Sequence, residues 1–164
     1  MPHPIVAEIP RMRRYARALT GNAADADDLV QDTLERAYAK WHTWRRGAEA
    51  RPWLFAIMHN LFVDRAKLRR SHLVVAPLED AGEVEVRGGQ DAATARLDVA
   101  AALARLSPAH REVLLLVALE ELSYADAARV LDVPLGTVMS RLAAARARLR
   151  ELAGDAPGAR KVTP

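Results

Sequence analysis

Apolar side chains recur at helical spacing along most of this chain, and no stretch shows the sustained alternation typical of strands. Near both ends the successive spacings are 4, 3, 4 and 3 residues. The residues concerned are Ile5, Ile9, Met12, Ala16 and Leu19 in one segment, and Val138, Leu142, Ala145, Leu149 and Leu152 in the other. Such spacing places side chains on one face of an α-helix. The sequence therefore predicts an all-α protein.

Charge divides the 164 residues into three parts, although the net charge is only +3. Residues 1–72 have a balance of +5 (13 basic, 8 acidic), residues 73–100 of −4 (2 and 6), and residues 101–164 of +2 (9 and 7). The central part also contains Pro77, Gly82, Gly88 and Gly89 and has no helical period. We predict two small helical domains, 1–72 and 92–156, joined by a flexible acidic linker over 73–91 and followed by a disordered tail at 157–164.

Composition narrows the classes of protein that fit. The chain has no cysteine, which excludes disulfide scaffolds, cysteine-based zinc sites and thiol catalysis. No apolar run approaches the roughly 18 residues of a membrane span, and the N-terminus does not have the pattern of a signal peptide. We expect a cytoplasmic protein with no direct membrane contact, no metal and no cofactor.

Aromatic residues are concentrated in the basic first domain, where seven of the eight lie. Rings mixed with Arg and Lys are typical of proteins that bind single-stranded nucleic acid, because every base offers a face for stacking. The alternative is that these rings simply fill the core of a small domain.

The second domain contains the pattern of a helix-turn-helix. Ser123 can cap a short helix, Asp132-Val133-Pro134 predicts a turn, and a longer amphipathic helix follows. On the face opposite the apolar stripe of that last helix lie Thr137, Ser140, Arg141, Ala144 and Arg148. Residues at the start of such a helix reach base edges or phosphates in the major groove, although a helix pair in any bundle has a similar pattern.

Two stretches resemble a known family. DADDLVQDTLERAYAKW (25–41) with RPWLFAIMHNLFVDRAKLRR (51–70) resembles the region-two domain of bacterial extracytoplasmic-function (ECF) sigma factors. The stretch at 103–152 resembles the region-four domain of the same family, and the two occur in the family's order. The resemblance implies a promoter-specificity subunit of bacterial RNA polymerase, which is not itself an enzyme. Its partners would be core RNA polymerase, promoter DNA and an anti-sigma factor.

The resemblance also implies three sets of site residues. The surface that docks on core polymerase would comprise Asp28, Leu29, Val30, Gln31 and Asp32. Melted minus-ten DNA would be bound by Trp44, Arg45, Arg46, Asn60, Asp64, Arg65, Lys67, Arg69 and Arg70. The duplex minus-thirty-five element would be read by Thr137, Ser140, Arg141, Ala144 and Arg148. Met139 and Ala144 stand where the family commonly has a cation, which predicts weaker upstream binding.

Three other functions compete with this interpretation. A stand-alone helix-turn-helix regulator would bind paired half-sites without polymerase. A metal-dependent hydrolase would use Asp25, Asp28, Asp32 and His59, but these lack the spacing of a metal site. We expect His59 instead to be partly exposed and to face solvent or nucleic acid. A decoy that binds an anti-sigma factor would keep the fold but lose the promoter contacts, and the basic run at 65–70 argues against it.

Overall fold

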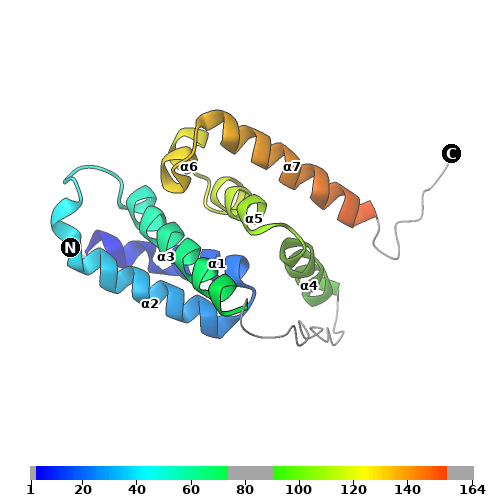
Figure 1. Ribbon diagram of the computed structural model, residues 1–164, viewed down its shortest axis with the longest axis horizontal. Coiled ribbons are helices and arrows are strands. Elements are labelled where there is room, and N and C mark those ends of the chain that lie inside the picture. Colours follow the sequence, from blue (N-terminus) through cyan, green and yellow to red (C-terminus); the bar gives the residue numbers. More distant parts are fainter. Residues whose placement is uncertain (1–2, 74–90, 155–164) are drawn as a thin grey trace.

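The computed structural model describes residues 3–73 and 91–154, and every regular element in these ranges is helical (Figure 1). The first domain contains α1 (Pro4–Thr20), α2 (Ala23–Ala39), a short 3₁₀ turn η1 (Trp41–Thr43) and α3 (Ala50–Leu73). The second contains α4 (Asp91–Ala104), α5 (Pro108–Leu114), a π-helical turn η2 (Leu115–Leu119), α6 (Tyr124–Leu131) and α7 (Leu135–Gly154). The all-α prediction is confirmed. The predicted linker, apart from its ends, and the predicted tail lie outside the described residues.

Side chains cap three of these helices. The Asn22 carboxamide oxygen accepts a hydrogen bond of 2.8 Å from the backbone N–H of Asp25 at the start of α2. Ser107 caps α5, and Ser123 caps α6 by accepting a hydrogen bond of 3.0 Å from the backbone N–H of Asp126. Each cap satisfies a backbone donor that has no partner within its helix, so each fixes the start of a helix.

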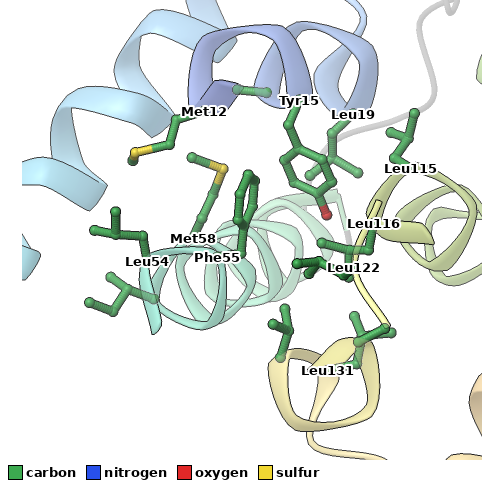
Figure 2. Packing of buried hydrophobic residues seen from close by; sticks show 14 of the residues in the cluster. Met12, Tyr15, Leu19, Leu54, Phe55, Met58, Leu115, Leu116, Leu122 and Leu131 are labelled. Atoms are coloured by element: carbon green, nitrogen blue, oxygen red, sulfur yellow. The ribbon is translucent and has the colours of Figure 1, made fainter. Parts of the chain in front are cut away.

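The core of the first domain is built from the predicted apolar stripes. Met12 and Leu19 of α1 are fully buried with Leu54 and Met58 of α3 (Figure 2). Leu29 of α2 is buried in the same cluster. Ile9 is only partly buried, whereas Tyr15, which the stripe left out, is buried and packs edge-on against the Phe55 ring. The C-terminal end of α3 is exposed, including Leu68.

The two domains pack against each other and share one cluster of buried residues. Leu115 and Leu116 of η2, with Leu122 beyond it, lie beside Tyr15 and Phe55 of the first domain (Figure 2). The helix α6 packs on α3, and η2 packs on α1. Domains of this size bury only a modest fraction of their surface alone, so the apolar side of η2 gains stability by packing on its neighbour.

The second domain has the predicted helix-turn-helix. The helix α6 ends at Leu131, the next residue Asp132 has a φ of 52° in the left-handed region, and α7 begins at Leu135. Val138, Leu142 and Ala145 of α7 are buried, as the apolar stripe predicts. None of the described helices has the length and apolar character needed to cross a membrane.

Candidate nucleic-acid interface

The predicted docking surface on α2 is divided between buried and exposed residues. Asp28, Gln31 and Asp32 are exposed, whereas Leu29 and Val30 are buried in the core. The two apolar side chains therefore hold α2 on α1 and α3, and only the three polar ones are available to a partner. In Figure 1, α2 lies on the side of the molecule away from α6 and α7.

Two of the predicted DNA-binding arginines on α3 form ion pairs with α2. Arg65 pairs with Asp32, and Arg69 donates a hydrogen bond of 3.0 Å to Asp25. The hydrogen bonds from Asn22 and then Arg69 lower the pKa of Asp25 below its ordinary value of 3.8. These contacts fix the distal half of α3 beside α2.

The remaining predicted α3 contacts face solvent. They are Asn60, Asp64, Lys67 and Arg70. Because they lie at helical spacing, they form a polar strip of amide, carboxylate and cationic groups along α3. Such a strip can donate to base edges and neutralise phosphates.

In the region between α2 and α3, the tryptophan rings pack inward, whereas the arginine side chains face solvent. The Trp44 ring stacks on Trp41, with ring centroids 4.7 Å apart, and Trp53 meets Trp41 edge-on at 6.1 Å. All three rings pack against the core. Arg45 and Arg46 are exposed. The two cations are thus free to meet a polyanion, while the aromatic cluster supports the loop beneath them.

The start of α7 presents a mixed surface. Of the predicted residues, Ser140, Ala144 and Arg148 are exposed, while Thr137 and Arg141 are partly buried. Arg148 donates a hydrogen bond of 2.9 Å to Glu151. Met139 is 53% exposed, so an apolar side chain occupies a prominent place in the first turns of this helix.

The polar contacts between the two domains were not predicted from the sequence. The Arg14 guanidinium donates to the Glu120 carboxylate at 3.0 and 3.3 Å and to the backbone oxygen of Leu119. Arg11 lies 3.9 Å from the other oxygen of Glu120, which is fully buried. These partners are more than one hundred residues apart, and no local pattern relates them.

His59 is partly exposed, as expected, but the expectation that it faces solvent or nucleic acid is wrong. Its side chain is only 13% exposed, and its Nδ1 lies 2.7 Å from a carboxylate oxygen of Glu112 in the second domain. It therefore faces the other domain, because α3 packs against the second domain through α6 and reaches Glu112 of α5. The hydrolase alternative loses its cluster, since Asp25 and Asp32 instead pair with arginines of α3. Within the described ranges, no group of three or more His, Cys, Asp or Glu side chains is arranged to hold a metal.

Arg111 makes a further contact between the domains. Its guanidinium donates to the backbone oxygens of Leu103 and Ala104 at the end of α4 and of Leu106 beyond it. It also donates to the backbone oxygen of Leu19 at the end of α1, at 2.8 Å. Partial burial lowers the pKa of Arg111 from its ordinary value. The cation satisfies carbonyls at two helix ends, where the helix dipole is negative.

Comparisons with known proteins agree with this arrangement. The model of the sigma2 domain of PhyR matches residues 5–59, and the model of sigma-70 region 4 matches residues 96–149. The chain is 38% identical over 148 residues to the ECF RNA polymerase sigma factor EcfG of Rhodopseudomonas palustris, covering 90% of this chain and 82% of EcfG. It is also 38% identical to the ECF RNA polymerase sigma factor SigM of Mycobacterium tuberculosis, covering 88% of this chain and 72% of SigM.

Solved structures extend the likeness to the fold. The sigma factor RpoE from Bartonella quintana, in complex with the anti-sigma factor NepR, superposes with a TM-score of 0.75 at 31% identity. That match covers 93% of this chain and 95% of RpoE. The anti-anti-sigma factor PhyR from the same organism, also bound to NepR, shares the fold, with a TM-score of 0.62 at 20% identity over 90% of this chain and 48% of PhyR. The sigma2 and region 4 matches, in this order, and the identity to sigma factors over most of the chain make this protein a member of the ECF RNA polymerase sigma factor family.

Proposed function

We propose that this chain binds core RNA polymerase through its first domain and directs it to promoters through both domains. The domains would span 1–72 and 92–156, with 73–91 as the tether. The observation that carries the proposal is the pair of sigma-domain matches, in order, on a molecule whose α2 presents Asp28, Gln31 and Asp32 to solvent. Phosphoryl transfer would remain with the polymerase, so the chain itself would be no enzyme.

The α2 surface has the chemistry of a docking site for a basic partner. Two carboxylates and an amide stand on one exposed face, held by Leu29 and Val30 beneath. Opposite charge across an interface steers the encounter and fixes orientation more than it adds affinity. A basic helix of core polymerase is therefore the proposed partner of this face.

Each domain would read a different form of the promoter. In the first domain, Arg45 and Arg46 of the loop and the exposed strip of α3 would hold melted minus-ten DNA. In the second domain, the start of α7 would enter the major groove of the duplex minus-thirty-five element, with Ser140 and Arg141 near the bases.

We further propose that an anti-sigma factor controls this chain. The support is the RpoE neighbour, which is bound to the anti-sigma factor NepR. A partner that covers the docking and DNA-binding faces would keep the factor from polymerase until it is released.

A second candidate function is that of a decoy, which would bind an anti-sigma factor without directing transcription. The observation that favours it is that the matching sigma2 model is that of PhyR, and a PhyR neighbour is an anti-anti-sigma factor. The exposed cations Arg45, Arg46, Lys67 and Arg70 argue for the first function, because a decoy has no use for phosphate contacts.

Reconstitution with core polymerase separates the two functions. The wild-type protein should form holoenzyme and give defined transcript starts on genomic DNA, whereas a decoy would give neither. Asp28→Arg with Gln31→Ala should weaken assembly and shift the free energy of unfolding by no more than about 0.5 kcal/mol, because both side chains are exposed. Asp27→Arg makes the same charge change on a neighbouring exposed residue and should assemble normally. Unaltered assembly by the double variant would remove the docking assignment.

A further inference from the structure

The exposed face of the first three turns of α7 is uncharged and largely apolar. Val138, Leu142 and Ala145 of these turns are buried, and Arg141 is partly buried. The exposed residues from 135 to 145 are Leu135, Gly136, Met139, Ser140, Ala143 and Ala144. The part of the helix that would enter a major groove therefore presents no guanidinium, carboxamide or carboxylate among its exposed side chains.

Met139 is the side chain that projects from this face. It is 53% exposed, and its neighbours Gly136, Ser140 and Ala143 are small. A Cβ atom placed on Gly136 would meet no other atom within 4 Å, so no part of the described chain covers this surface. A methionine side chain is flexible and polarisable, and it adapts to irregular apolar surfaces. Met139 is thus free to contact a partner.

Polar reading of bases by this face is limited. The Ser140 hydroxyl donates a hydrogen bond of 3.1 Å to the backbone oxygen of Thr137, so its proton is already used within the helix. What an apolar side chain can recognise in the major groove is the 5-methyl group of thymine, which the other three bases lack. The chemistry of the exposed face therefore matches a thymine methyl better than a hydrogen-bonding base edge.

The charges around Met139 favour DNA over another protein as the partner. Residues 135–150 contain four arginines and no acidic residue. Arg146, Arg148 and Arg150 of this set are exposed. Cations beside an apolar side chain suit a groove whose walls carry phosphates and whose floor carries methyl groups.

We propose that Met139 contacts the 5-methyl group of a thymine in the duplex minus-thirty-five element, and that this chain consequently selects an A·T pair at that position. The proposal rests on the function proposed above. A methionine in place of a cation lowers the affinity for DNA of any sequence, and in return it adds discrimination between bases.

Deoxyuridine tests the contact, because it differs from thymidine only by the missing methyl group. The probe is a fluorescent promoter duplex taken from upstream of a mapped transcript start, and its minus-thirty-five thymines on both strands are replaced by deoxyuridine one at a time. Holoenzyme containing the full wild-type chain should lose about fourfold in affinity at one position, measured by anisotropy. This factor corresponds to about 0.8 kcal/mol for one buried CH₂ group.

Met139→Ala should bind the thymine duplex more weakly than wild type does and should lose the preference at that same position. The comparison of two proteins with two duplexes forms a double-mutant cycle, which isolates the contact from other effects of either change. Met139→Leu keeps an apolar side chain and should keep most of the preference.

Two variants serve as controls. Arg141→Ala should weaken the binding of both duplexes and keep the thymine preference. Val99→Ala truncates an apolar side chain that is 60% exposed on α4, and it should change neither affinity nor preference. Because Met139 and Val99 are both exposed, their variants should keep the wild-type circular dichroism spectrum.

The outcomes separate this proposal from the function on which it rests. Equal thymine preference in wild type and Met139→Ala, no preference in either, or minus-thirty-five elements without an A·T pair would overturn the proposal and leave the sigma factor function standing. A Met139→Ala variant that fails to form holoenzyme would assign the side chain to a protein contact and would also overturn it. A wild-type chain that gives no defined transcript starts would overturn the proposed function as well.

Discussion

Leu116→Ala tests whether the two domains unfold as one unit. Leu116 lies in η2 of the second domain, is fully buried, and belongs to the cluster that contains Tyr15 and Phe55 of the first (Figure 2). Truncation of a buried leucine costs about 2–5 kcal/mol, from lost burial and from the cavity that remains. With a denaturant slope of about 2 kcal/mol per molar urea, the unfolding midpoint should fall by about 1–2.5 M.

Tryptophan fluorescence makes this test specific to one domain. The three tryptophans, Trp41, Trp44 and Trp53, all lie in the first domain, whereas circular dichroism reports the helices of both. Because the domains share one core, the fluorescence midpoint should move with the dichroism midpoint, although the altered side chain belongs to the other domain.

Leu135→Ala supplies the control. Leu135 is 49% exposed at the start of α7, so its truncation should change the free energy of unfolding by about 0.5 kcal/mol or less. If Leu116→Ala left the fluorescence midpoint at its wild-type value while dichroism showed a separate earlier transition, the domains would unfold independently. The reasoning from a shared core would then be refuted.

Three other predictions concern the DNA-binding faces and the interface. Arg141→Ala should lower transcription equally from a duplex promoter and from a promoter that is premelted at its downstream element. Trp44→Ala should instead impair promoter opening, and premelting should relieve this defect. The reverse pattern would contradict the division of DNA reading between the two domains. Met139→Lys should steepen the slope of log affinity for upstream duplex against log salt by about 0.9, measured by fluorescence anisotropy of holoenzyme, and an unchanged slope would argue against a phosphate contact there. Burial, followed by the charges of Glu112 and Glu120, raises the pKa of Tyr15 well above 10.0. The contribution of the neutral Tyr15 hydroxyl to the free energy of unfolding should be fully present below pH 10 and should decline as the pH rises toward the raised pKa. Tyr15→Phe should remove this decline, measured as the urea midpoint at each pH. A decline of equal size in the variant would assign it to other groups.

The sequence by itself determined the helices and their buried faces. The apolar spacing identified Met12 and Leu19 in α1 and Val138 and Leu142 in α7, because a helix face is set by residues three and four apart. Ser123 marked a helix start for the same reason, since a cap bonds only to its own first turn. The family resemblance also rested on local stretches of sequence.

Only the tertiary structure decided how these helices meet and which candidate residues are free. It buried Leu29 and Val30, paired Arg65 and Arg69 with acids of α2, and placed Trp44 on Trp41. It also brought His59 to Glu112 and Arg14 to Glu120, which makes the domain interface polar as well as apolar. Contacts across 53 and 106 residues leave no periodic trace in the sequence, because the partner of each charge is set by the packing of whole helices and not by spacing along the chain.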